Sequence, residues 1–184
     1  NFKDAVPSLK TALKVNPQNP EIYNHIGMCY KLIGELDSAQ KYFEKGLEIK
    51  KDDFNIMTNL ANLLKDKGEF SKSIELYKKC IELNTDNQWG IYYNIGLVNQ
   101  LQNNFKEAIK HYEISIKMNP YQADTYTSLS ECMLDSNDLE SAYKLLQKSQ
   151  KLEKNNFRTQ HNLGLYYKHK DQTEIAIECF ENSI

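Results

Sequence analysis

Arginine and glycine are scarce in this sequence, and long apolar runs are missing. Its 184 residues include one arginine and seven glycines. Because Arg158 is the single guanidinium, recognition by several bidentate arginine forks is nearly excluded. The glycines form no phosphate-binding loop, and no apolar stretch approaches the roughly 20 residues of a membrane-spanning helix. We therefore expect a soluble intracellular protein, placed in the cytoplasm, without membrane insertion.

An excess of positive charge is also absent. The chain has 23 basic and 25 acidic residues and a formal net charge of -2. Nucleic-acid binders need clustered positive charge for their phosphate contacts. The twelve tyrosines fall mostly at positions expected in a packed core, so they do not indicate a stacking platform for bases. We expect no nucleic-acid partner.

Catalytic and metal-binding patterns are lacking as well. Cys29, Cys80, Cys132 and Cys179 lie far apart in the sequence, as buried cysteines of a reducing compartment do. His25 and Cys29 have the i, i+4 spacing of two metal ligands, but no third ligand recurs near them. No Ser-His-Asp or paired-acid arrangement is evident. We expect no cofactor, no metal and no enzymatic activity.

Small residues recur at intervals of 34 or 35 residues. They are Gly27, Ala61, Gly96, Ser130 and Gly164. Twelve positions later come Ala39, Ser73, Ala108, Ala142 and Ala176. Four positions further on come the large apolar residues Phe43, Tyr77, Tyr112, Leu146 and Phe180. A period of this length is typical of stacked-repeat solenoids.

Each period has a residue between its halves that tolerates a left-handed backbone. These residues are Gly34, Gly68, Asn103, Asn137 and Asp171. Such residues end one helix and turn the chain into the next. The repeat is therefore predicted to be a hairpin of two helices, and the fold to be all-α. We expect the helical glycines to permit close approach of the paired helix, with Gly27, Gly96 and Gly164 facing Ala39, Ala108 and Ala176.

The register resembles that of the tetratricopeptide repeat (TPR). Residues 20–53 carry Tyr23, Ile26, Gly27, Tyr30, Gly34, Ala39, Phe43 and Gly46 at the family offsets. Residues 89–122 carry Tyr92, Ile95, Gly96, Ala108, Tyr112, Ser115 and Pro120. The resemblance implies αα-hairpins stacked into a right-handed superhelix, a solenoid.

The repeat register divides the whole chain into one array over residues 1–184. Residues 1–19 match only the second helix of a repeat. Full repeats are predicted at 20–53, 54–88, 89–122 and 123–156, followed by a truncated repeat at 157–184. Because neither terminal repeat shows a polar outer face, we expect a fragment of a longer protein.

In members of this family the first helices line a concave groove, and positions 2, 5, 6, 9, 12 and 13 of each repeat point into it. Position 1 here is residue 20, 54, 89, 123 or 157. The candidate partner-binding residues are Asn24, His25, Thr58, Asn59, Asn62, Tyr93, Asn94, Ser128, Glu131, Arg158 and Asn162.

Asparagine recurs at position 6 of the repeats. Asn59, Asn94 and Asn162 occupy it, and a spaced row of amides can hold the backbone of an extended peptide. Similar asparagine ladders occur in the repeat arm of O-GlcNAc transferase and in kinesin light chains. The alternative is that asparagine, which occurs 19 times, is merely common in this chain.

Chaperone-binding members of the family hold a C-terminal carboxylate of Hsp70 or Hsp90 through lysine, asparagine and arginine at set positions. Asn62 and Asn94 fit that pattern. Thr58 replaces the first lysine, and Asp124 and Ser128 replace the final basic pair. Because Asp124 would repel a carboxylate, chaperone tails are not expected as partners.

The resemblance implies a scaffold or adaptor that binds a partner protein or an extended peptide in the groove, within a larger multi-protein assembly. The alternative is the substrate-recognition arm of a larger enzyme similar to O-GlcNAc transferase. A third possibility is end-to-end self-association of the array.

Overall fold

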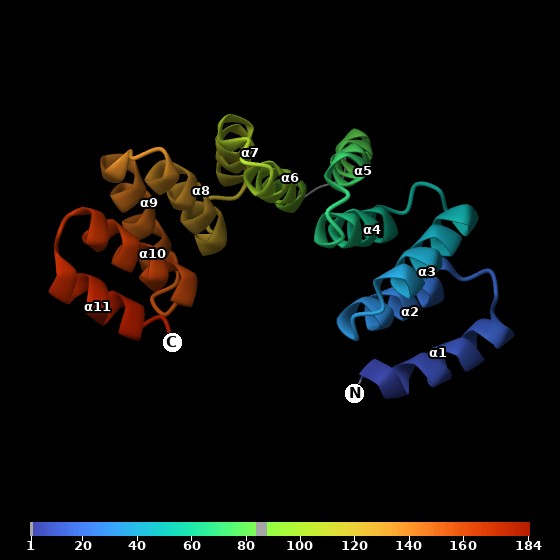
Figure 1. Cartoon of the computed structure of the whole chain (residues 1–184). Coiled ribbons are helices and arrows are strands. Elements are labelled where there is room, and N and C mark those ends of the chain that lie inside the picture. The colour runs from blue at the N-terminus through green and yellow to red at the C-terminus, as the bar shows by residue number, and fades with distance from the viewer. Residues whose placement is uncertain (1, 84–87) are drawn as a thin grey trace. The chain divides into compact units, whose positions relative to one another are not determined.

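The computed structural model describes residues 2–83 and 88–184, and helices are the only regular elements among them (Figure 1). In chain order they are α1 (Phe2–Val15), α2 (Pro20–Leu32), α3 (Leu36–Ile49), α4 (Phe54–Asp66), α5 (Phe70–Glu82), α6 (Trp89–Leu101), α7 (Phe105–Met118), α8 (Ala123–Asp135), α9 (Leu139–Leu152), α10 (Phe157–His169) and α11 (Thr173–Glu181). The predicted all-α fold class is confirmed.

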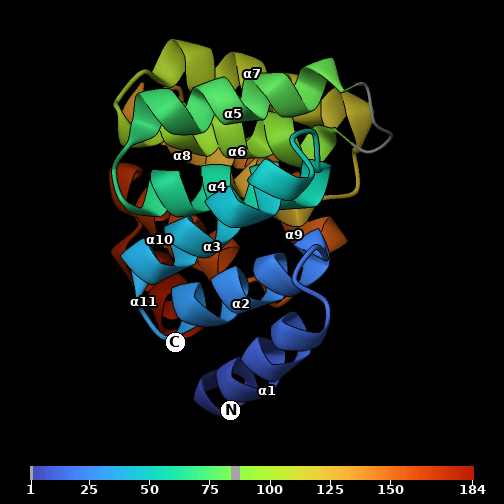
Figure 2. The ribbon, with the colours of Figure 1, turned by 90° about the vertical axis from the view of Figure 1, so that its right-hand side faces the viewer.

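The helices pair in the order that the repeat register predicts. α2 packs against α3, and the same pairing recurs in α4 with α5, α6 with α7, α8 with α9 and α10 with α11. Figure 2 shows α2 and α3 side by side, with α1 next to α2. Residues 84–87 of the predicted repeat 54–88 lie outside the described residues.

By its contacts the chain divides into an N-terminal unit, Asn1–Asp86, and a C-terminal unit, Asn87–Ile184. Each unit is a stack of helical hairpins and is described by itself below. The single continuous array over residues 1–184 stays a prediction.

The turn inside every hairpin has a left-handed residue at the predicted place. The φ angles are 85° at Gly34, 78° at Gly68, 59° at Asn103, 58° at Asn137 and 57° at Asp171. Glycine has no Cβ to clash there, and asparagine and aspartate tolerate this region better than other residues. The helix-ending role predicted for these five residues is confirmed.

The small residues of the repeat mark the closest approach of paired helices. A Cβ atom on Gly96 would lie 2.5 Å from Cε1 of Tyr112, and one on Gly27 would lie 2.6 Å from Cε1 of Phe43. Gly164 meets Phe180 in the same way. The sequence predicted that the alanines of the second helices would face these glycines. The nearest atoms belong instead to the aromatic rings four residues further on.

The apolar register positions form the core. Ala39, Phe43, Tyr77, Tyr112 and Leu146 are fully buried. The four cysteines are also buried and carry free thiols, so their predicted place as core residues is confirmed. Within the described part of the chain, no helix is both long and apolar enough to cross a membrane.

Successive first helices approach each other more closely than successive second helices do. In the N-terminal unit α2 contacts α4, and in the C-terminal unit α8 contacts both α6 and α10. Among the described residues the second helices show no such approach between α3 and α5, α7 and α9, or α9 and α11. Each unit therefore curves with its first helices on the inner side, which is where the candidate residues lie.

Candidate functional site

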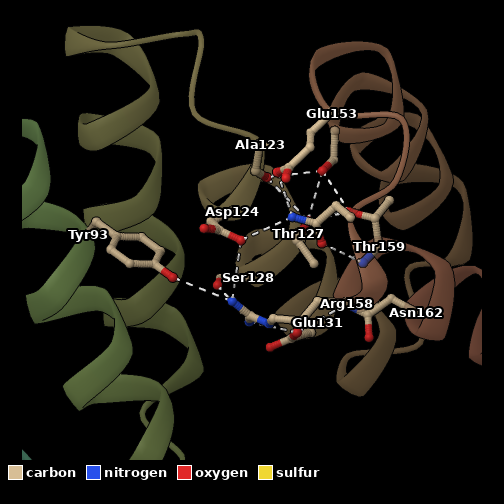
Figure 3. Close-up of polar contacts among 12 residues, drawn as sticks. Tyr93, Ala123, Asp124, Thr127, Ser128, Glu131, Glu153, Arg158, Thr159 and Asn162 are labelled. Atoms are coloured by element: carbon tan, nitrogen blue, oxygen red, sulfur yellow. Dashed lines mark hydrogen bonds and ion pairs between the residues drawn. The ribbon is translucent and has the colours of Figure 1, made fainter. Parts of the chain in front are cut away.

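A polar network joins the three first helices of the C-terminal unit, and Arg158 on α10 is at its centre (Figure 3). Nη2 of Arg158 donates to Oε1 of Glu131 at 2.9 Å and to Oγ of Ser128 at 3.1 Å. Nη1 lies 3.5 Å from the hydroxyl of Tyr93 and 3.9 Å from the carboxylate of Asp124. One side chain of α10 thus reaches both α8 and α6.

Glu131 on α8 accepts further hydrogen bonds. Nδ2 of Asn162 donates to its Oε1 at 3.0 Å, and Nε2 of Gln100 donates to its Oε2 at 3.0 Å. Oε1 of Gln100 in turn accepts from the hydroxyl of Tyr112 at 2.6 Å. The network therefore runs from the inner helices to the core tyrosine of α7.

The charge of Arg158 is matched within the protein. Burial disfavours the charged guanidinium, but the negative charge of Glu131 and the hydrogen bonds that Arg158 donates to Tyr93 and Glu131 outweigh burial and raise the pKa of Arg158. The side chains of Arg158 and Glu131 are 30% and 25% exposed. The pair is half-buried, and its short hydrogen bond links α8 to α10.

The N-terminal unit shows a similar but smaller set of contacts. Nδ2 of Asn59 on α4 donates to Oδ1 of Asn24 on α2 at 2.9 Å. Oδ1 of Asn62 accepts from the hydroxyl of Tyr77 at 2.5 Å. Nζ of Lys31 lies 2.8 Å from a carboxylate oxygen of Asp66. Amides and charges at the inner face pair across repeats here as well.

Lys65 stands beside that ion pair. Its Nζ is 3.8 Å from Asp66, and its side chain is 18% exposed. Burial lowers the pKa of Lys65, the neighbouring Lys31 lowers it further, and Asp66 opposes both. A single carboxylate thus balances two lysines in the N-terminal unit.

The predicted site residues fall into three groups. Tyr93, Ser128, Glu131, Arg158 and Asn162 are brought together in the C-terminal unit, and Ser128 and Asn162 are buried there, at 0% and 3% exposure. Their role in partner binding stays a prediction.

The second group lies in the N-terminal unit. The side chains of Asn24 and Asn59 are joined by a hydrogen bond, and Asn62 accepts one from Tyr77. The amides of Asn24 and Asn59 are half-buried. Part of their hydrogen-bonding capacity is therefore used inside the protein.

The third group contains residues outside these two sets of contacts. Oγ1 of Thr58 donates to the carbonyl of Phe54 one turn earlier, at 2.7 Å, and lies 3.7 Å from Sγ of Cys80 on α5. His25 is exposed and Asn94 is half-buried, and neither side chain has a hydrogen-bond partner within residues 2–83 and 88–184. The role of these three residues in partner binding stays a prediction.

Sequence reasoning missed a cluster of buried hydroxyls where α8, α9 and α10 meet. The Oγ atoms of Thr127, Ser149 and Thr159 lie 2.8 Å from one another. Thr127 and Ser149 also reach the carbonyl of Ala123, at 3.2 and 3.1 Å. Three hydroxyl hydrogens serve these five contacts, so only three are hydrogen bonds at any moment. The cluster is closed to solvent and is a packing element.

The hydrogen bonds of Gln100 and the Lys31–Asp66 ion pair were also not predicted from the sequence. Polar residues at repeat positions 12 and 13 of successive repeats could have indicated these contacts. No group of three or more His, Cys, Asp and Glu side chains that could hold a metal occurs among the residues the structure describes.

The geometry defines a helical-repeat protein with a polar inner face. Models of the tetratricopeptide repeat match residues 1–56, 54–87, 90–122 and 157–184. These matches span most of the chain. The chain belongs to the tetratricopeptide repeat family.

Curated relatives are similar at low identity. The tetratricopeptide repeat-containing protein trd-1 of Caenorhabditis elegans is 22% identical over 164 residues, which cover 89% of this chain and 20% of that protein. The BBSome complex member BBS4 of Bos taurus is 24% identical, covering 76% of this chain and 27% of that protein.

The protein O-mannosyl-transferase TMTC3 of Homo sapiens is 25% identical, covering 85% of this chain and 19% of that protein. This chain spans about a fifth to a quarter of the length of these relatives. Among solved structures, PilW, a type IV pilus biogenesis factor, has a TM-score of 0.88 at 20% identity, covering 97% of this chain and 82% of that one. Its similarity shows the fold alone.

Proposed function

We propose that this chain is a scaffold or adaptor segment that binds a partner protein, through an extended peptide, along the inner face of its first helices. The observation that carries the proposal is the arrangement of that face. First helices of neighbouring repeats are in contact there, and their polar side chains bond from repeat to repeat. A prealigned face reduces the side-chain ordering that binding costs.

Asn94 and Asn59 are the residues most directly suited to hold a peptide backbone. Asn94 is half-buried and has no hydrogen-bond partner within the described residues. Asn59 uses one amide hydrogen on Asn24 and keeps its carbonyl oxygen. A primary amide offers both donors and an acceptor, which is what an extended peptide backbone requires.

The family and one relative support a non-catalytic role in an assembly. TPR folds are interaction modules, and BBS4 is named as a member of the BBSome complex. The four buried thiols are consistent with a reducing cytoplasmic setting. We therefore place the chain in a multi-protein assembly of the cytoplasm.

The test is affinity capture from source-cell lysate followed by mass spectrometry. The chain is compared with Asn59→Ala/Asn94→Ala and with Gln147→Ala, a control amide exposed on the outer helix α9. Thermal melting first confirms that all three fold. We expect a partner that the chain and the Gln147 control retain and the double variant loses. Equal capture by all three would place binding elsewhere and refute the proposed face.

A second candidate function is the substrate-recognition arm of a larger enzyme. It is favoured by the match to TMTC3, which covers 85% of this chain but 19% of a protein named as a transferase. Sequencing the parent gene on both sides decides between the two. A catalytic domain in the same reading frame supports the arm, and further repeats alone support the scaffold.

End-to-end association between chains is a third candidate. Ile175 and Ile177 on α11 are 42% and 52% exposed, which leaves apolar surface on the last helix. Light scattering at several protein concentrations tests it. A mass that rises with concentration supports association, and a constant monomer mass rejects it.

A further inference from the structure

A pocket of about 410 Å³ opens in the C-terminal unit between α6, α7 and α8. Its apolar wall consists of Leu97, Leu101 and Phe105, and Leu101 is 59% exposed. The polar part of the lining consists of Gln100, Asn103, Glu131 and Asp135. The pocket therefore combines an aliphatic wall with an acidic end.

The N-terminal unit has a carboxylate at the repeat position of Asp135, and there it binds a lysine. Lys31 and Asp66 occupy positions 12 and 13 of successive repeats, and their charged groups are 2.8 Å apart. Gln100 and Asp135 occupy the equivalent positions in the C-terminal unit. Glutamine replaces the lysine, so the cation that pairs with the carboxylate is missing from α6.

Asp135 is left without a counter-charge. Its exposed side chain has no hydrogen bond or ion pair within residues 2–83 and 88–184. Glu131, the other carboxylate of the pocket, is already bound by Arg158 and Asn162. Asp135 is thus the available acceptor.

The helix ends add to the negative potential. α6 ends at Leu101 and α8 ends at Asp135, and neither has a basic residue in its last turn. The last turns of α2 and α4 contain Lys31 and Lys65. The carbonyl groups at a helix C-terminus favour a cation, and here no side chain of the two helices supplies one.

We propose that the pocket between α6, α7 and α8 binds a lysine or arginine side chain of the partner peptide, with its aliphatic stem on Leu97 and Leu101 and its charge on Asp135. This inference rests on the proposed peptide-binding function and gives the chemistry of one subsite. The Lys31–Asp66 pair is its intramolecular counterpart.

The test uses the full chain, labelled with ¹⁵N, and two capped probe peptides that differ in one residue. One is acetyl-Ala-Leu-Lys-Leu-Ala-amide, and the other has norleucine in place of lysine, which keeps the aliphatic stem and removes the charge. Chemical-shift titrations at millimolar peptide give the two affinities and the residues affected. We expect the lysine peptide to bind about tenfold more tightly, with shifts at the ends of α6 and α8.

Two variants test the role of the carboxylate. Asp135→Asn is expected to abolish the preference for lysine over norleucine. Asp66→Asn is the control, because it removes one negative charge at the equivalent position of the N-terminal unit. The carboxylate of Asp66 is already paired with Lys31, so this variant is expected to leave the preference for lysine over norleucine unchanged.

A third variant fills the site from within. Gln100→Lys gives α6 the lysine that α2 has, and it is expected to weaken binding of the lysine peptide about tenfold, in a chain that melting shows to be folded.

Equal binding of both peptides along the first helices overturns the lysine subsite and leaves the proposed function standing. A lysine preference that survives Asp135→Asn overturns the subsite as well. Failure of both peptides to bind also overturns it, and the proposed function is then decided by the Asn59→Ala/Asn94→Ala capture.

Discussion

Arg158 and Glu131 form an ion pair at 2.9 Å that links α10 to α8 across two repeats. Because each side chain is about one quarter to one third exposed, the pair is neither a surface contact nor a fully buried one. Removing one partner leaves the other half-buried without its nearest opposite charge. We therefore expect the ion pair to stabilise the stacking of the last two repeats. Its coupling energy can be measured.

A double-mutant cycle with Arg158→Ala and Glu131→Ala is expected to give a coupling energy of about 1 to 2 kcal/mol from urea denaturation. The matched control is the i, i+4 pair Lys144 and Glu140 on α9, whose side chains are 70% and 81% exposed. That pair is expected to give about 0.3 to 0.5 kcal/mol. A coupling energy no larger than that of the control would refute the stabilising role.

Gly96 is expected to tolerate no side chain. The added methyl of Gly96→Ala would lie 2.5 Å from the Tyr112 ring, so the gain of about 1 kcal/mol in helix propensity is outweighed by overpacking. We expect a net loss of about 1 to 3 kcal/mol of unfolding free energy, and a larger loss for Gly96→Leu.

Gly90 is the control in the same helix. A Cβ atom there meets nothing within 4 Å, so Gly90→Ala is expected to be neutral or to stabilise by up to about 1 kcal/mol. Thermal melting of the two variants checks the contrast. Similar melting temperatures for Gly96→Ala and Gly90→Ala would contradict the close-packing account.

Asp53 caps α4 and gives the stability of the N-terminal unit a pH dependence. Its Oδ1 accepts from the backbone N–H groups of Asn55 and Ile56, both at 3.1 Å, and Lys50 lies 2.9 Å from its other oxygen. Burial opposes ionisation, but the hydrogen bonds from Lys50, Ile56 and Asn55 outweigh it and lower the pKa of Asp53.

The pKa of Asp53 is lower in the folded state than in the unfolded state, where it is about 4. The stabilisation of the folded state by the ionised Asp53 is therefore present above the unfolded-state pKa, and it is lost as the pH falls through the folded-state pKa. Asp53→Ala is expected to cost about 1 kcal/mol at pH 7 and less than that at pH 3. Asp53→Asn keeps the cap and is expected to cost less at pH 7. Urea denaturation at both pH values checks this, and an equal cost of Asp53→Ala at both would contradict it.

The sequence predicted the hairpins and their turns because those features depend on residues close together in the chain. Asn103 and Asp171 could be assigned to turns from their tolerance of positive φ alone. Contacts between repeats were harder to predict. The contact that buries Asn162 against Glu131 depends on a residue 31 positions away on a neighbouring helix, and the role of Asn162 in partner binding stays a prediction.

The same limit explains the missed hydroxyl cluster. Thr127, Ser149 and Thr159 come from three helices, and nothing within one repeat indicates that their side chains meet. The equivalent positions of Ser149 and Thr159 in the N-terminal unit are Gly46 and Ile56, where a Cβ atom on the glycine would lie 2.8 Å from Cδ1 of the isoleucine. One interface thus uses hydroxyls where the other uses apolar packing.

This comparison predicts a strongly non-additive pair of substitutions. Ser149→Gly alone removes one hydroxyl and leaves a void, and Thr159→Ile alone forces a larger side chain against Ser149, so each is expected to cost about 1 to 3 kcal/mol. Together they reproduce the Gly46–Ile56 contact, and Thr127 keeps its hydrogen bond to the carbonyl of Ala123.

The double variant is therefore expected to be more stable than the sum of the single changes by at least about 1 kcal/mol, because replacing both partners of a polar contact costs less than removing one of them. Urea denaturation of the chain, both single variants and the double variant gives the interaction energy directly. Gln147→Ala, an exposed change on α9, is the control and is expected to lie within about 0.5 kcal/mol of the unmodified chain. Additive costs would mean that the hydroxyls contribute independently, and that the two interfaces are not interchangeable solutions of the same packing.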